Sequence, residues 1–188
     1  GSYFHLQKEK NTPALCYAIN KEQFEIAKII LSSDKCNVNN AITIRKYELD
    51  QDENDSSERS KWSWSPLAKT KIPALCIAVQ KNNVETVKLL LSSPKIDVNA
   101  ECLKESYYIE KEEKEEEEEE EENENKKEIN WIFEKKIESP LHIAVNNSNK
   151  EIILLLLKDE RINLDQVDDK NKKAIDCAKN DEIKKLFQ

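Results

Sequence analysis

Glycine is nearly absent from this chain, since Gly1 is the only one in 188 residues. A chain without internal glycine cannot hold a glycine-rich phosphate loop, and the HExxH and GxSxG motifs are missing as well. Histidine is also scarce, and neither His5 nor His142 lies near a plausible nucleophile. We therefore expect no enzymatic activity, and we assign no catalytic residue and no cofactor.

Paired cysteine motifs are missing too. The chain has an odd number of cysteines and no CxxC pair, and two histidines are too few for the common zinc patterns. Reduced thiols and no metal site are therefore expected, in an intracellular and most simply cytoplasmic protein. No apolar run reaches transmembrane length, and the first ten residues lack the apolar core of a signal peptide, so no membrane partner is expected. The cysteines are Cys16, Cys36, Cys76, Cys102 and Cys177.

Negative charge is concentrated in one segment. The net charge is −8, and the stretch Glu110–Glu128 alone contributes −9, with thirteen Glu against four Lys. The rest of the chain is close to neutral. No stripe of Lys and Arg with interleaved aromatics is present, so nucleic acid is not an expected partner. By electrostatics alone, a basic protein suits the acidic segment better.

The chain repeats itself. "TPALCYAINKEQFEIAKIILSSDKCNVN" from Thr12 and "IPALCIAVQKNNVETVKLLLSSPKIDVN" from Ile72 are identical at fourteen of 28 positions. A third copy, "SPLHIAVNNSNKEIILLLLKDERINLD", begins at Ser139, and a shorter fourth, "KKAIDCAKNDEIKKLF", begins at Lys172. The spacing of apolar residues predicts two short helices in each copy. One such pair cannot bury its own apolar face, so the copies are expected to stack.

These copies resemble ankyrin repeats. "SPLHIA", "ETVKLLL" and "IDVNA" are similar to the TPLHxA motif, the second helix and the exit segment of that family. The family usually has glycine between its two helices, but here Glu22, Asn82 and Ser148 occupy those turns. Asn or a short polar residue is the next best occupant of such a turn.

The equivalent residues Leu15, Leu75 and Leu141 are 60 and 66 residues apart, whereas Leu141 and Ile175 are 34 apart. The additional residues in the two longer intervals could be degenerate repeats or insertions. Insertions are favoured because no further repeat motif occurs in either interval. Each insertion holds a segment rich in strand-forming residues, then a charged segment, then a second strand-like segment that contains aromatic residues. This order predicts a long β-hairpin, which we call a finger. The expected fold is an all-α dominated repeat solenoid of stacked helix-turn-helix ankyrin repeats, with elongated hairpin fingers in two insertions between repeats.

This gives a single domain over residues 1–188, with residues 1–2 resembling a cloning scar. The expected parts are repeat 1 at about 11–40, an insertion at 41–70, repeat 2 at 71–100, an acidic insertion at 101–137, repeat 3 at 138–166 and a capping repeat at 167–188. The chain is expected to be a C-terminal fragment of a longer array.

Several residues have more than one interpretation. The aromatics Trp62, Trp64, Trp131 and Phe133 could pack between the fingers, or they could form a patch that binds a partner. Cys16 and Cys76 stand where the family has His, and they are interpreted as small core residues rather than catalytic thiols. His142 is expected to make local hydrogen bonds.

The resemblance implies a non-catalytic protein-interaction module, whose partner is contacted by residues at the end of each first helix. In this chain those residues are Asn20, Lys21, Gln80, Lys81, Asn146 and Asn147. The alternative is a polyanionic binder, in which the Glu-rich finger captures a basic protein or a cation. The run Glu115–Glu122 lacks the spaced ligands and turn of a tight calcium site.

Overall fold

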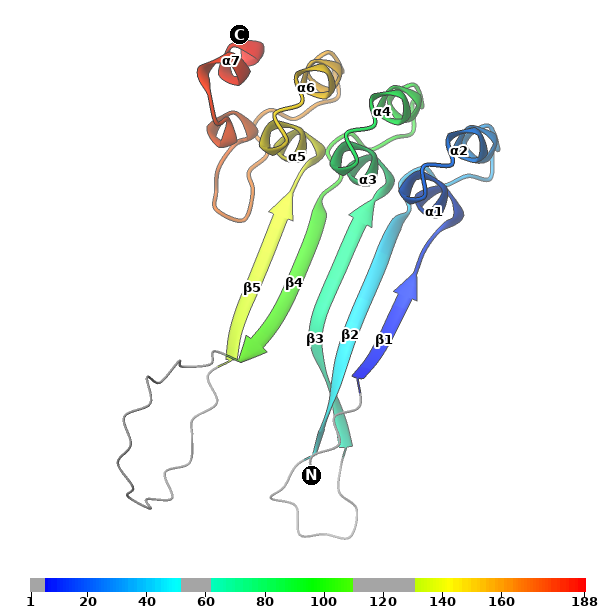
Figure 1. The fold of residues 1–188 in the computed structure, drawn as a ribbon, viewed down its shortest axis with the longest axis vertical. Coiled ribbons are helices and arrows are strands. Elements are labelled where there is room, and N and C mark those ends of the chain that lie inside the picture. Colours follow the sequence, from blue (N-terminus) through cyan, green and yellow to red (C-terminus); the bar gives the residue numbers. More distant parts are fainter. Residues whose placement is uncertain (1–5, 52–61, 110–130) are drawn as a thin grey trace.

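The computed structural model describes residues 6–51, 62–109 and 131–188 (Figure 1). The whole acidic segment Glu110–Glu128, including Glu115–Glu122, therefore lies outside the described residues. Two rows of helices lie at one end of a twisted antiparallel sheet, with α1, α3 and α5 next to the strands and α2, α4 and α6 farther away (Figure 1).

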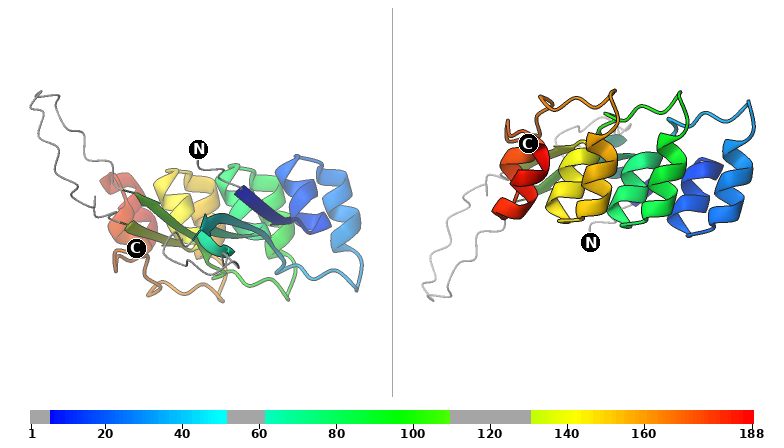
Figure 2. Two further views of the ribbon diagram at one scale, coloured as in Figure 1. Left: turned by 90° about the horizontal axis from the view of Figure 1, so that it is seen from below. Right: turned by 90° about the horizontal axis from the view of Figure 1, so that it is seen from above.

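Each of the first three copies forms two helices of seven or eight residues, as the apolar spacing predicts. The first helices are α1 (Ala14–Asn20), α3 (Ala74–Gln80) and α5 (Pro140–Asn146). The second helices are α2 (Phe24–Leu31), α4 (Val84–Leu91) and α6 (Lys150–Leu157). The fourth copy is shorter, with η1 (Ala174–Cys177), α7 (Asp181–Lys184) and η2 (Lys185–Phe187). The helix pairs lie side by side in one row (Figure 2).

The turn between the two helices requires a left-handed backbone conformation. Glu22, Asn82 and Ser148 have φ angles of 59°, 53° and 55°, which confirms the predicted position of the turns. A residue with a Cβ atom adopts this conformation at a cost that glycine does not have. The chain therefore forms these turns without glycine at some expense in stability.

The core runs through the repeats at equivalent positions. Leu15, Leu75 and Leu141 are at most 2% exposed, and they pack with the small alanines of the first helices. Those alanines, Ala18, Ala78 and Ala144, are at most 1% exposed and allow neighbouring helices to approach closely.

The strands are β1 (Leu6–Asn11), β2 (Ala41–Gln51), β3 (Trp62–Pro73), β4 (Cys102–Ile109) and β5 (Trp131–Glu138). Two of these five described strands, β2 and β3, have more residues than any of the helices. The hairpins β2/β3 and β4/β5 are the two expected fingers. In addition, β1 pairs with β2 and β3 pairs with β4, which joins all five strands into one sheet in chain order.

The predicted all-α dominated solenoid is therefore wrong, and the fold is a mixed one of helices and a five-stranded antiparallel sheet. The first two repeats contribute two strands each and the third contributes β5. Two strand spacings of about 4.8 Å equal the usual distance of about 8–10 Å between packed helices. Adjacent fingers consequently come within hydrogen-bonding distance once the helices stack. Sequence patterns within one finger could not reveal this pairing between fingers.

Neighbouring repeats are also joined by an asparagine after each second helix. The Asn39 side chain donates to the Lys95 carbonyl and accepts from the Asp97 N–H, both at 2.8 Å. One repeat later, Asn99 repeats this pattern with the Arg161 carbonyl at 2.9 Å and the Asn163 N–H at 2.8 Å. The same two bonds therefore recur at each described interface between full repeats.

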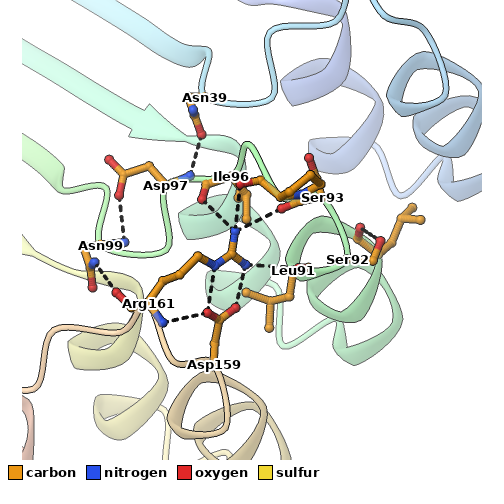
Figure 3. Close-up of polar contacts among 11 residues, drawn as sticks. Asn39, Leu91, Ser92, Ser93, Ile96, Asp97, Asn99, Asp159 and Arg161 are labelled. Atoms are coloured by element: carbon orange, nitrogen blue, oxygen red, sulfur yellow. Dashed lines mark hydrogen bonds and ion pairs between the residues drawn. The ribbon is translucent and has the colours of Figure 1, made fainter.

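Arg161 adds a clamp at the second of these interfaces (Figure 3). Its guanidinium forms a two-point ion pair with Asp159, at 2.8 Å from Nε to Oδ1 and 2.6 Å from Nη2 to Oδ2. It also donates to four carbonyls of the preceding repeat, including that of Leu91 in the last turn of α4, at 3.1–3.3 Å. Carbonyls at a helix end have no partner within the helix, so a cation there is favourable.

Ser148→Gly is expected to raise the free energy of unfolding by up to about 1 kcal/mol, because glycine adopts the left-handed turn without a Cβ clash. Chemical denaturation of the full chain measures this. Ser148→Ala keeps the Cβ atom and is expected to stay near the original value. Equal stability of the glycine and alanine variants would contradict this account of the turn.

Arg161→Ala is expected to lower the free energy of unfolding by about 1–2 kcal/mol. The expected loss is smaller than for a fully buried arginine with the same contacts, because the Arg161 side chain is partly exposed. Lys95→Ala is the matched control, because Lys95 holds the equivalent position one repeat earlier and its ammonium makes no hydrogen bond among the described residues. That variant should remain within about 0.5 kcal/mol of the original.

The clamp should also depend on pH. The hydrogen bond from Arg161 lowers the pKa of Asp159 below its ordinary 3.8. The resulting stability is present above that ordinary pKa and is lost as the pH falls through the lower value of the folded state. The difference between the original chain and Arg161→Ala should therefore shrink in acid; a difference independent of pH would contradict the ion pair.

Candidate protein-binding surface

One face of the sheet carries a row of lysines. The strand register aligns Lys10, Ile44, Thr70, Lys104 and Lys136 across β1 to β5, so these residues lie on the same face. The three lysines are exposed. Lys46, two residues along β2 on the same face, is exposed as well.

Two of these lysines lie directly opposite each other. Lys104 on β4 pairs with Lys136 on β5, an arrangement of like charges that destabilises a sheet. Glu138 offsets part of this repulsion, since its carboxylate is 2.9 Å from the Lys136 ammonium. The hydrogen bond from Glu138 raises the pKa of Lys136, so this lysine remains a cation at neutral pH.

The ends of the first helices lie on the same side as the lysine row. Gln80, the last residue of α3, approaches Cys102 with 3.6 Å between Nε2 and Sγ. Asn146, the last residue of α5, donates to the Glu138 carboxylate at 2.8 Å. Cys102 and Glu138 face each other across β4 and β5 on the lysine face. Helix ends and sheet thus form one continuous surface.

The six helix-end residues predicted to bind a partner occupy equivalent places, but they have different contacts. Asn20 and Asn146 are partly buried, whereas Lys21, Gln80, Lys81 and Asn147 are exposed. Lys81 is 3.5 Å from the Glu22 carboxylate of the preceding repeat. Asn147 donates to the Val79 carbonyl at 3.3 Å, which ties the second and third repeats together. Their role in binding stays a prediction.

Of the four predicted aromatic residues, the structure describes the side chain of Phe133, which lies on the other face of the sheet. Phe133 is 49% exposed and contacts Tyr107 with 4.9 Å between ring centroids. The two rings pair across β4 and β5 on the face opposite the lysine row. The side chains of Trp62, Trp64 and Trp131 lie outside the described residues.

In the first two repeats, a buried cysteine thiol occupies the position that the imidazole of His142 holds in the third repeat. Cys16 and Cys76 are fully buried, and their thiols donate to the carbonyls of Asn40 and Ala100 at 3.2 and 3.3 Å. Burial raises the pKa of Cys16 to about 11 and that of Cys76 well above its ordinary value. Both thiols are therefore protonated at neutral pH and unsuited to nucleophilic attack.

His142 fills the equivalent position in the third repeat and makes the local hydrogen bonds expected of it. Its Nε2 is 2.9 Å from the Lys172 carbonyl, so this nitrogen carries the proton. The Ser139 hydroxyl lies 2.7 Å from Nδ1 and donates to it. The ring links the third repeat to the short fourth one.

Within residues 6–51, 62–109 and 131–188, no group of three or more His, Cys, Asp or Glu side chains is placed to hold a metal ion. Among the same residues, no helix has the length and apolar character needed to cross a membrane.

The lysine row was not among the features predicted from the sequence. The alternation of side chains along β4 and β5 was available in the sequence, and aligning the two arms of the hairpin would have placed Lys104 beside Lys136. The alignment with Lys10 needs the register between separate fingers, which only the assembled sheet provides.

A model of the ankyrin repeat family matches residues 72–102 and 138–169. These segments contain α3 with α4 and α5 with α6, so the predicted resemblance is confirmed and the chain carries ankyrin repeats. The first copy lies outside the matched segments but has the same pair of helices. A search of curated proteins and a search of solved structures each found no match to the chain. Ankyrin repeats are generally protein-interaction modules and are usually non-catalytic.

Alkylation of the native chain at neutral pH should modify Cys36 and Cys177, which are partly exposed, at least about tenfold faster than Cys16, Cys76 and Cys102. Mass spectrometry of the digested protein identifies each site. All five thiols should react once the chain is unfolded. Rapid modification of native Cys16 or Cys76 would contradict their burial.

Proposed function

We propose that this chain is a non-catalytic interaction module that binds an acidic segment of another protein on the lysine face of its sheet. The observation that carries the proposal is the opposed pair Lys104 and Lys136, aligned with Lys10. Like charges held directly opposite each other reduce stability, and an anionic ligand would relieve that repulsion.

The helix ends extend the same surface. Lys21 and Lys81 add cations beside the sheet, and the amides of Gln80 and Asn146 supply hydrogen-bonding groups at its margin. Glu134 and Glu138 are the described acidic side chains on β4 and β5 of this face, and Glu138 is already paired with Lys136. The described part of the surface is therefore mainly cationic, although the whole chain is acidic.

The probe is poly-L-glutamate, with fluorescence anisotropy as the readout. The double change Lys104→Glu with Lys136→Glu should weaken binding at least about tenfold, because it reverses the charge at the centre of the row. Binding to the original chain should also fall as salt is added, since these charges are exposed.

The matched control is Lys69→Glu with Lys135→Glu, which makes the same change in net charge on the opposite face. Binding should be reduced much less in this variant. An equal loss in both double variants would show that only net charge matters, and the proposed surface would then be wrong.

In the alternative, the Glu-rich finger captures a basic protein or a cation. This alternative predicts that the chain binds a basic probe and that this binding depends on the finger rather than on the lysine face. Its support is the excess of Glu in residues 110–128, all of which lie outside the described part of the chain. Under that alternative, deletion of residues 111–127 abolishes binding of a basic probe such as poly-L-lysine, and reversal of Lys104 and Lys136 leaves it unchanged.

A further inference from the structure

One edge of β5 is not covered by any described strand. Its other edge pairs with β4, its one neighbour in the described sheet (Figure 1). In a strand, successive residues point their N–H and carbonyl groups to opposite edges. The Ile137 N–H points away from β4, because it donates to the Asp169 carboxylate at 2.9 Å. The N–H and carbonyl groups of Lys135 and Phe133 therefore also lie on the outer edge.

The path of the third repeat leaves this edge open. Asp168 is equivalent to Cys102, the first residue of β4. A turn takes the place of a leaving strand there, since the Asp168 N–H donates to the Lys172 carbonyl at 2.9 Å. The described residues after this turn form the short helices of the fourth copy. The edge of β5 is thus left open by a turn inside the third repeat.

Cations lie along this edge on the lysine face. Lys136 is exposed on that face, directly opposite Lys104. The Lys179 ammonium lies near the same end of β5, because it donates to the Asn146 carbonyl at 2.9 Å, and the Asn146 amide binds Glu138, the last residue of the strand. Acidic side chains of an added strand would therefore have cations beside them.

The opposite face offers an apolar contact. The rings of Phe133 and Tyr107 are 49% and 41% exposed and lie 4.9 Å apart. Successive side chains of a strand alternate between the two faces, so an added strand presents every second residue to the lysine face and the others to these rings. In an antiparallel strand, the residue three positions after the one beside Lys136 lies opposite Phe133.

We infer that the acidic partner segment binds as an extended strand, added antiparallel to β5 at its outer edge. Its backbone exchanges hydrogen bonds with Lys135 and Phe133, and an acidic residue lies beside Lys136. An apolar residue three positions later packs on Phe133. In such strand addition, main-chain hydrogen bonds supply affinity and alternate side chains supply specificity. The inference rests on the proposed function, because its ligand is the acidic segment proposed to bind the lysine face.

The probe is a fluorescein-labelled peptide, Glu-Glu-Glu-Thr-Thr-Val-Thr-Thr, with anisotropy as the readout. In the inferred register its third Glu lies beside Lys136 and its Val opposite Phe133. Two N-methylated forms make a matched pair. Methylation of the first Thr and the Val removes the N–H groups that face β5, so binding should weaken at least about tenfold. Methylation of the third Glu and the second Thr, whose N–H groups face away, should change binding less than about threefold.

A matched pair of chain variants tests the same edge from the other side. Lys135→Pro removes an N–H of the outer edge, and proline is tolerated on an edge strand where that group faces solvent. It should weaken binding of the unmodified peptide at least about fivefold. Lys135→Ala keeps the N–H and should bind within about twofold of the original chain. Circular dichroism checks that both variants are folded.

Equal effects of the two methylated peptides, or a greater loss with the form methylated at the third Glu, would overturn the strand geometry and leave the lysine face as the binding surface. No binding of the unmodified peptide, under conditions where poly-L-glutamate binds, would do the same. A dimer of the chain that Lys135→Pro dissociates, seen by analytical ultracentrifugation, would assign the edge to a second copy. The proposed function itself fails if neither probe distinguishes the original chain from Lys104→Glu with Lys136→Glu.

Discussion

The fold depends on a match between two distances. Packed helices lie about 8–10 Å apart, and two neighbouring strand spacings cover about the same distance. The first two repeats each contribute one strand that enters and one that leaves, and the third contributes the entering strand β5, so stacking the helices brings the five strands into one antiparallel sheet. A repeat between two others that had a single strand, or helices separated by a larger distance, could not satisfy both layers at once.

Much of the helical layer could be predicted from the sequence. The recurrence of Leu15, Leu75 and Leu141 placed the first helices, and the polar residues Asn82 and Ser148 marked turns that have a left-handed backbone. These features are local, because each depends on residues within one repeat. The two hairpins could be predicted for the same reason, since both arms of each finger are in one insertion.

The rest could not be predicted because it arises between units. The joined sheet depends on the spacing of the repeats, and the row of Lys10, Lys104 and Lys136 depends on a register shared by separate fingers. Arg161 illustrates the same limit, since four of its hydrogen bonds reach carbonyls of the preceding repeat. A lysine at the equivalent position 95 gives no indication that its arginine counterpart has this role.

The long hairpins also affect how the repeats unfold. In a stack joined only by helices, each unit contacts its neighbours through short surfaces, and the ends can open separately from the middle. Here β2 and β3 form the hairpin between the first two repeats. Their pairing begins at Ala41 with Pro73 and ends at Gln51 with Trp62, so the two repeats share a ladder of strand pairs that has more residues than any of their helices. Opening one repeat requires that ladder to break as well, which strengthens nearest-neighbour cooperativity and opposes fraying of the array.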